Sequence, residues 1–189
     1  MKKQIIKVGF DLDGVLLYNP TRIVRPVIVF IKKIFFKDQI DKFHYPKTAI
    51  QQIIWSLLHK SSMFVSPGYE EIKNLIKNKQ IEAYIISARY EFLKSDFDKW
   101  INIMKAKKYF KKFYINKNGK QPYIFKREII SRLKLDIYIE DNWDIVRQIT
   151  KTQSKTKVFW ISNYFDRNIK YDFKFKNLKK AVETLKKLA

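Results

Sequence analysis

The chain has 189 residues, which suits one domain or one domain with a modest insertion, and 46% of them are hydrophobic, enough for a sizeable core. It has no Cys and only two His, so disulfides, thiol catalysis, cysteine-held metal clusters and histidine-rich metal sites are excluded. The formal net charge is +22, and any bound metal must be held by oxygen atoms, which is typical of Mg²⁺.

Five short apolar segments, rich in β-branched and aromatic residues, are typical of buried strands. They span residues 5–10, 81–86, 113–115, 137–139 and 158–161. Helical patterns lie between and after them, at residues 69–79, 91–106, 125–134, 143–150 and 177–188. Strands that alternate with helices form βαβ units and a parallel sheet covered on both faces. The sequence therefore predicts an α/β fold with a doubly wound parallel sheet, similar to the Rossmann type.

Residues 16–66 do not follow this alternation. They lack a clear strand and contain two helical runs, at about 22–37 and 48–59, before Pro67-Gly68 marks the return to the regular pattern. We predict a small helical cap at 16–66, inserted after the first strand and packed over one end of the sheet. Residues 1–15 and 67–189 then form the core.

Polar and acidic residues follow three of the predicted strands. They are Asp11, Asp13 and Gly14 after the first strand, Ser87, Ala88 and Arg89 after the second, and Glu140, Asp141 and Asp144 after the fourth. In an open α/β sheet the carboxyl ends of the strands meet at one edge, where ligands bind. Several carboxylates brought together there would repel one another, and a divalent cation held by oxygens would neutralise them.

Each of these segments also has a purely structural interpretation. Asp-x-Asp-Gly is a common turn, Ser87 is suited to cap a helix, and an acidic Glu140-Asp141-Asn142 segment favours a helix N-terminus. Their occurrence in order, each at the end of an apolar strand, favours a shared site over three unrelated turns.

Together the segments resemble the four motifs of the haloacid-dehalogenase-like hydrolase superfamily. The resemblance rests on VGFDLDGVL (8–16), YIISAR (84–89), an upstream lysine and IYIEDNWD (137–144), and it covers about residues 4–15 and 67–165. It implies a phosphatase or phosphotransferase that works through an aspartyl-phosphate with Mg²⁺, and an insertion after the first motif is where that superfamily places a helical cap.

The resemblance also implies roles for individual residues. Asp11 is the expected nucleophile, and Asp13 the expected general acid and base. Ser87 is expected to bond a phosphoryl oxygen, while Gly14, Ala88 and Arg89 are candidate substrate-binding residues. The expected Mg²⁺ ligands are Asp11, the carbonyl of Asp13, and Asp141, with Glu140 and Asp144 as direct or water-mediated supports.

Two assignments stay open at the level of the sequence. The phosphoryl-stabilising lysine is either Lys126, which opens the helix before the fourth strand, or Lys120. We favour Lys126 because the connection from that helix to the strand, at 134–137, is very short. The fourth motif has Glu-Asp where Asp-Asp or Gly-Asp is commoner, so either Glu140 or Asp141 is the direct metal ligand.

The substrate is also open, and the charge bears on it. We expect hydrolysis of a small phosphorylated metabolite or nucleotide; the alternatives are a nucleic-acid-end (3′) phosphatase and a catalytically idle basic binding protein. Of the 40 basic residues 33 are Lys, a bias that an AT-rich coding sequence also produces, so we expect only weak, sequence-independent nucleic-acid binding. Lys7, Asp11 and Asp13 interrupt the apolar stretch that a signal peptide would need. No apolar run is long enough to span a membrane, so we expect a soluble, cytoplasmic protein.

Overall fold

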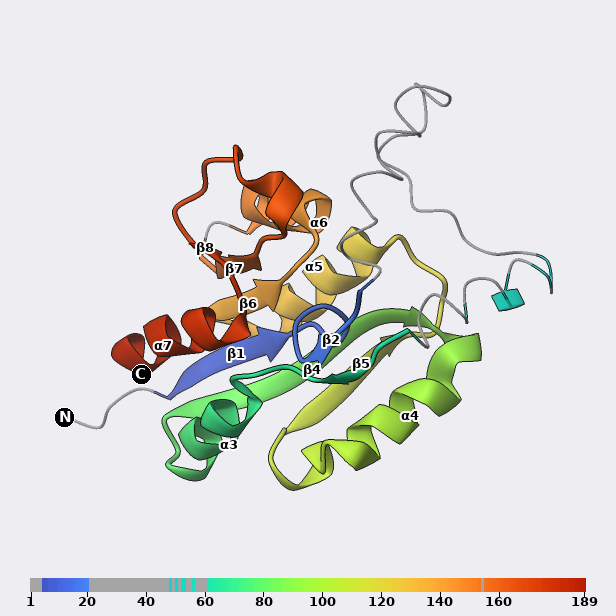
Figure 1. The fold of residues 1–189 in the computed structure, drawn as a ribbon, viewed down its shortest axis with the longest axis horizontal. Coiled ribbons are helices and arrows are strands. Elements are labelled where there is room, and N and C mark those ends of the chain that lie inside the picture. The colour runs from blue at the N-terminus through green and yellow to red at the C-terminus, as the bar shows by residue number, and fades with distance from the viewer. Residues whose placement is uncertain are drawn as a thin grey trace.

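A six-stranded parallel sheet forms the centre of the computed structural model (Figure 1). The structure describes residues 5–20, 48, 50, 52–53, 56, 61–153 and 155–189. The strand order is β5-β4-β1-β6-β7-β8, and each neighbouring pair is parallel. The chain winds outward from β1 on one side, then crosses back and winds outward on the other. The fold class predicted from the sequence, a doubly wound α/β sheet, is therefore confirmed.

The sequence positions of the main elements agree with the apolar segments described above. The strands of this sheet are β1 (Ile6–Phe10), β4 (Ile81–Tyr90), β5 (Lys112–Asn116), β6 (Ile137–Glu140), β7 (Lys157–Ile161) and β8 (Lys174–Phe175). The helices that pack against this sheet are α3 (Tyr69–Lys77), α4 (Lys94–Ile103), α5 (Pro122–Leu133), α6 (Trp143–Thr152) and α7 (Leu178–Leu188).

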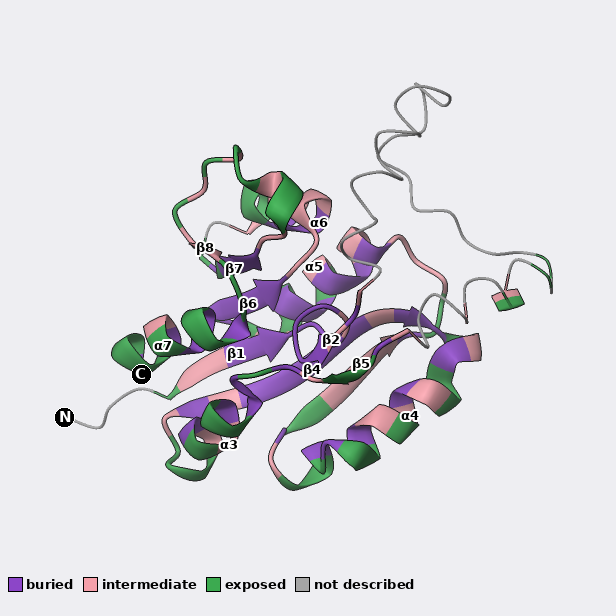
Figure 2. Ribbon diagram, viewed as in Figure 1, coloured by how far each residue is buried: buried purple, intermediate pink, exposed green. Residues whose placement is uncertain are grey.

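The helices cover both faces of the sheet, and each face has its own apolar core (Figure 2). Alternate residues of β1, β4 and β6 point to opposite faces, as strand geometry requires. Phe10, Ile85 and Ile139 pack with α3, α4 and α7, whereas Ile86 and Tyr138 pack with α5 and α6. Because helices bury both faces of the sheet, a polar site has room only at an edge, such as the one formed by the carboxyl ends of the strands.

The main sheet and its helices differ from the sequence-based elements in three places. Strand β4 continues through Ser87, Ala88 and Arg89 to Tyr90, so Ser87 lies inside the strand and does not cap a helix; the pairing with β5 shifts register after Ser87. The short edge strand β8 was not predicted. The segment predicted as one helix over 91–106 divides into a 3₁₀ turn at Glu91–Leu93, helix α4 and a second 3₁₀ turn at Ala106–Lys108.

A second, two-stranded antiparallel sheet lies at the base of the predicted insertion. It pairs β2 (Leu17–Tyr18) with β3 (Phe64–Val65), so the two ends of the 16–66 segment lie side by side. The sequence pattern indicates no strand in this range. Most of the helical cap expected between these strands falls outside the described residues, so its helical character and the domain division stay predictions.

Within the described residues, no helix has the length and apolar character needed to cross a membrane.

Candidate active site

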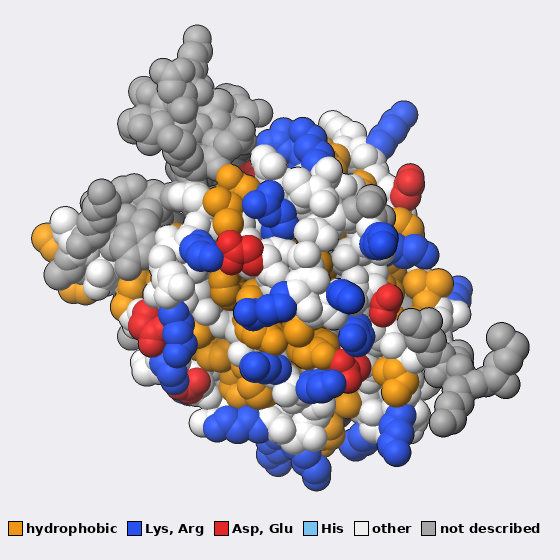
Figure 3. Space-filling model, turned by 180° about the vertical axis from the view of Figure 1, so that it is seen from behind, with side chains coloured by type: hydrophobic (Ala, Val, Ile, Leu, Met, Phe, Trp, Pro, Cys, Tyr) orange, Lys and Arg blue, Asp and Glu red, His pale blue; other side chains and the backbone are white. Residues whose placement is uncertain are grey.

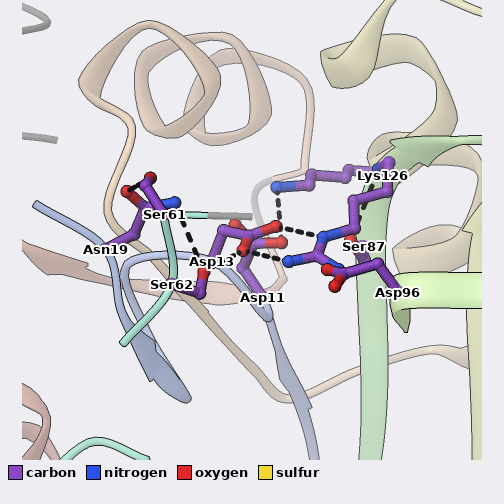
Figure 4. A network of polar contacts seen from close by, with 9 residues as sticks. Asp11, Asp13, Asn19, Ser61, Ser62, Ser87, Asp96 and Lys126 are labelled. Carbon is purple, nitrogen blue, oxygen red and sulfur yellow. Dashed lines mark hydrogen bonds and ion pairs between the residues drawn. The ribbon is translucent and has the colours of Figure 1, made fainter. Parts of the chain in front are cut away.

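Most of the residues singled out in the sequence lie at the carboxyl edge of the sheet, beside its central strand. The chain reverses its winding direction at β1, which pairs with β4 on one side and β6 on the other. Such a switch point opens a crevice at the strand ends. Asp11 and Asp13 after β1, Ser87 on β4 and Lys126 on α5 lie close together there (Figure 4). Glu140, the last residue of β6, contacts Lys126.

Asp11 lies immediately after β1 and is buried next to a buried lysine. Its backbone N–H donates to the carbonyl of Ile139 on β6 (3.0 Å), which fixes the start of the loop. The Nζ atom of Lys126, in the first half of α5, lies 3.0 Å from Oδ1 of Asp11 and 2.7 Å from Oε2 of Glu140. Lys126 therefore bridges the ends of β1 and β6, at the position expected of the phosphoryl-stabilising lysine.

The alternative lysine lies elsewhere. Nζ of Lys120 is exposed and bonds both carboxylate oxygens of Glu128 on the surface of α5, at 2.6 and 2.9 Å. The geometry favours Lys126 over Lys120 for contact with a group bound at Asp11.

Burial and neighbouring charges strongly perturb this centre. Burial raises the pKa of Asp11, and the neighbouring Lys126 lowers it. The negative charges of Glu140, Asp141 and Asp13 raise it further, so the pKa of Asp11 lies well above its ordinary value. Burial alone would lower the pKa of Lys126, but Asp11 and Glu140 raise it above its usual range, which keeps the lysine charged. Lys126 offsets only part of the negative charge, and a cation near Asp11 would favour its ionised, nucleophilic form.

Three carboxylates provide a donor set for such a cation. Oxygen atoms of Asp11, Glu140 and Asp141 lie within 4.8 Å of one another. Hard oxygen donors of this kind suit Mg²⁺. Asp144 is not a member of this group; it lies in the first turn of α6, where its N–H donates to the Asn142 side chain (3.0 Å), and its supporting role stays a prediction.

Glu140 and Asp141 differ in what surrounds them. Glu140 is fully buried and accepts hydrogen bonds from Lys126, from the Tyr138 hydroxyl (3.1 Å) and from the N–H of Asn142 (3.1 Å). Asp141 is partly exposed and packs against Gly14: a Cβ added at Gly14 would lie 2.2 Å from Oδ2 of Asp141. The φ of +77° at Gly14 also favours glycine there. The arrangement makes Asp141 the more available ligand and gives Glu140 the task of holding Lys126.

Asp13, two residues after Asp11, lies within a hydrogen-bonded network (Figure 4). Its Oδ2 accepts from Nε of Arg89 and its Oδ1 from Nη2, both at 2.7 Å. The hydroxyl of Ser62 donates to Oδ1 at 2.9 Å, and the Asn19 side-chain amide donates to Ser62 (3.3 Å). The two ends of the insertion thus reach the carboxylate that the resemblance identifies as the general acid and base.

The remaining predicted residues also lie at this edge. Ser87 is buried near the end of β4, where its hydroxyl accepts from the N–H of Arg89 (3.3 Å), and Ala88 beside it is half-buried. The guanidinium of Arg89 is bonded to Asp13 and to Asp96 and its side chain is fully buried. The substrate contacts expected of Gly14, Ala88 and Arg89 stay predictions.

Sequence reasoning did not identify several members of the network. Asn19, Ser61 and Ser62 lie at the two ends of the insertion, and Asp96 in the first turn of α4. The available sequence signal for these residues was the placement of Asn19-Pro20 and Ser61-Ser62 beside short apolar runs. Nothing in the local sequence indicates that they approach Asp13.

Comparison with known proteins supports the fold. A scan against protein-family models finds no match, and neither does a search of curated proteins. Among solved structures, a Thermotoga maritima protein provisionally described as a beta-phosphoglucomutase is similar at a TM-score of 0.61, with 14% identity over 98% of this chain and 100% of that one. CbbY from Rhodobacter sphaeroides, in complex with phosphate, gives a TM-score of 0.59 with 12% identity over 94% and 96% of the two chains.

A third similar structure is a HAD-superfamily hydrolase from Ehrlichia chaffeensis, with a TM-score of 0.51 and 16% identity over 100% of this chain and 99% of that one. At these identities the likeness concerns the fold, and it spans nearly the full length of each protein. The resemblance predicted from the sequence motifs and the likeness in structure agree. The chain has the fold of the haloacid-dehalogenase-like hydrolases.

Proposed function

We propose that this protein is a Mg²⁺-dependent phosphatase that hydrolyses a phosphate monoester through an aspartyl-phosphate on Asp11. The observation that carries the proposal is the position of Asp11: a buried carboxylate at the end of the central strand, 3.0 Å from a buried lysine and grouped with two further carboxylates. This combination supplies a nucleophile, a fixed positive charge and oxygen ligands for a cation. The likeness in fold to a structure with bound phosphate and to a hydrolase supports the same proposal.

In the first step, a carboxylate oxygen of Asp11 attacks phosphorus and the ester P–O bond breaks. Asp13, in its protonated form, gives its proton to the leaving oxygen, so the alcohol departs neutral. Lys126 and the hydroxyl of Ser87 lie at the end of the sheet where the phosphoryl oxygens would be held, and the lysine stabilises their negative charge.

In the second step, water attacks the phosphorus of the aspartyl-phosphate and transfers a proton to the Asp13 carboxylate. The P–O bond to Asp11 breaks, which releases inorganic phosphate and restores both carboxyl groups. Asp11 and Asp141 would hold Mg²⁺ directly, with the carbonyl of Asp13 as a further proposed ligand and Glu140 and Asp144 as direct or water-mediated supports. When bound, this ion would neutralise charge on the transferring phosphoryl group.

Removal of divalent cations should abolish activity. We expect hydrolysis of p-nitrophenyl phosphate to fall to background in EDTA and to return with added Mg²⁺. Asp141→Asn should raise the Mg²⁺ concentration needed for half-maximal activity by about tenfold or more, because one charged ligand is lost. The matched control is Asp98→Asn on the exposed face of α4, where Asp98 pairs with Lys94. An EDTA-resistant activity, or equal Mg²⁺ dependence in both variants, would contradict the proposed metal site.

We also propose that the substrate is compact rather than a nucleic-acid end. Figure 3 shows Lys and Arg side chains spread over one face, interspersed with Asp, Glu and apolar side chains, which is the pattern of a solvated surface. The net charge of +22 nevertheless attracts polyanions of any sequence. A 3′-phosphatase acting on nucleic acid is the second candidate, and the charge is the observation that favours it.

Salt separates these two candidates. For a small phosphorylated metabolite or a mononucleotide, kcat/KM should change only modestly between low and high salt. For a nucleic-acid enzyme, log K should fall with log salt by about 0.7 per phosphate contact on a single strand. The measurement compares kcat/KM of a mononucleotide with that of a 3′-phosphorylated oligonucleotide at two salt concentrations. A preference of about tenfold or more for the oligonucleotide that disappears at high salt would favour the second candidate.

The third hypothesis, a catalytically idle binding protein, is disfavoured by the intact Asp11 and Asp13 pair and by the buried Lys126 beside it. A cytoplasmic location stays a prediction from the sequence.

A further inference from the structure

Asp13 is held by one of the most buried side chains of the protein. The guanidinium of Arg89 approaches it with two nearly equal hydrogen bonds, Nε to Oδ2 and Nη2 to Oδ1, each 2.7 Å long. Such a two-point contact fixes the rotation of the carboxylate as well as its position, which a single bond or a lysine cannot do. The side chain of Arg89 is 0% exposed, so this pair is not a flexible surface contact.

A second carboxylate fixes Arg89 from its other side. Nη1 of Arg89 lies 2.6 Å from Oδ2 of Asp96, in the first turn of α4, and the Asp96 side chain is 11% exposed. Burial alone would lower the pKa of Arg89, but Asp13 and Asp96 raise it above its ordinary value, so the guanidinium is charged. Asp96 on α4, Arg89 on β4 and Asp13 in the loop after β1 thus form a hydrogen-bonded chain of charged groups, with Arg89 in the middle.

This arrangement is costly as a device for stability alone. Burying an arginine with two carboxylates carries a large desolvation penalty, and well-packed apolar residues of similar volume often stabilise a protein as well or better. This chain of charged groups ends at Asp13, the carboxyl group that must contact the leaving oxygen of the substrate in the proposed mechanism. In other enzymes an acid or base is similarly oriented by a third group behind it.

We propose that Arg89, braced by Asp96, is a positioning residue that orients Asp13 for proton transfer, and that it does not itself contact the substrate. The inference rests on the proposed phosphatase function and changes the role expected for Arg89 from the sequence. A misaligned Asp13 delivers its proton poorly, and this matters most when the leaving oxygen is a poor leaving group. The loss on removing Arg89 should therefore depend on the leaving group.

The experiment measures kcat and KM for p-nitrophenyl phosphate, phenyl phosphate and an alkyl phosphate. Arg89→Met should lower kcat/KM, which reports the first step, for the alkyl phosphate by at least about tenfold more than for p-nitrophenyl phosphate, since general acid catalysis contributes about 10²–10⁴-fold to rates. Asp96→Asn should show the same leaving-group pattern with a smaller loss, and it tests the inference if Arg89→Met does not fold. The control, Asp98→Asn on the same helix, should match wild type for every substrate.

A double variant gives an independent readout. If Arg89 acts through Asp13, then Arg89→Met should cost little further activity in an Asp13→Asn background, because the group that it orients is already lost. An equal loss of kcat/KM for all leaving groups, a raised KM with unchanged kcat, or fully additive losses would overturn the positioning role; the raised KM would indicate substrate contact. A wild-type protein that cleaves none of these phosphates would instead overturn the proposed function, and the inference with it.

Discussion

Replacing Asp11 by Asn should abolish phosphate hydrolysis and leave the fold intact. The amide cannot form the covalent intermediate, so we expect kcat to fall by about 10³-fold or more, as when other catalytic nucleophiles are removed. The side chain keeps its shape, and Lys126 retains its 2.7 Å contact with Glu140. Because Asp11 lies buried among other acidic groups, loss of its carboxylate removes repulsion as well as attraction. The melting temperature should stay within a few degrees of the wild-type value.

Activity in the Asp11→Asn protein near the wild-type level would contradict the proposed nucleophile. A large fall in melting temperature would show that Asp11 acts chiefly in folding, so both quantities need to be measured on the same preparation.

Replacing Lys126 should produce two separable losses. Lys126→Met removes the positive charge beside Asp11 and should lower kcat by about 10²–10³-fold, as for loss of one preorganised electrostatic donor. It also leaves the fully buried Glu140 without its cation, which typically costs about 3–5 kcal/mol of folding free energy. Enzyme kinetics and denaturant unfolding measure the two losses independently.

A double variant distinguishes them. Lys126→Met with Glu140→Gln removes the unpaired buried charge, while the amide oxygen can still accept from the N–H of Asn142 and the amide NH₂ can donate to the Tyr138 hydroxyl oxygen. We expect most of the stability to return and the activity to stay low. Lys120→Ala is the matched control, because Lys120 is exposed and paired with Glu128; it should be nearly silent. A larger loss of kcat in Lys120→Ala than in Lys126→Met would mean that the lysines are wrongly assigned.

The sheet could be predicted from the sequence because its strands carry a local signal. Residues 5–10 and 137–139 are mostly apolar, with Ile and Val prominent among them, which is typical of a parallel strand between two layers of helices. The acidic and polar residues that follow them were informative for the same reason: the carboxyl ends of parallel strands converge. The sequence alone therefore places Asp11, Asp13, Ser87 and Asp141 near one edge of the sheet.

The unpredicted features depend on contacts between residues far apart in the sequence. Strands β2 and β3 are two residues long, too short for any periodicity, and they exist only because the ends of the insertion pair. Arg89 precedes Asp96 by seven positions but is 76 positions from Asp13, so no spacing rule indicates that it joins them. Helix α4 ends at Ile103, near Lys105, which has a φ of +51°. A positive φ is uncommon for a lysine, and the amphipathic pattern of the sequence does not indicate that the helix ends there.

The most direct test of the account is to trap the covalent intermediate. In Asp13→Asn, p-nitrophenyl phosphate should still phosphorylate Asp11, because its leaving group needs little protonation, while attack by water is slowed. Acid quenching during turnover, followed by proteolysis and mass spectrometry, should find one phosphoryl group on the peptide that contains Asp11, and none in the Asp11→Asn/Asp13→Asn double variant. Release of p-nitrophenol with the Asp11 peptide unmodified, or a phosphoryl group on another residue such as Ser87, would contradict the mechanism.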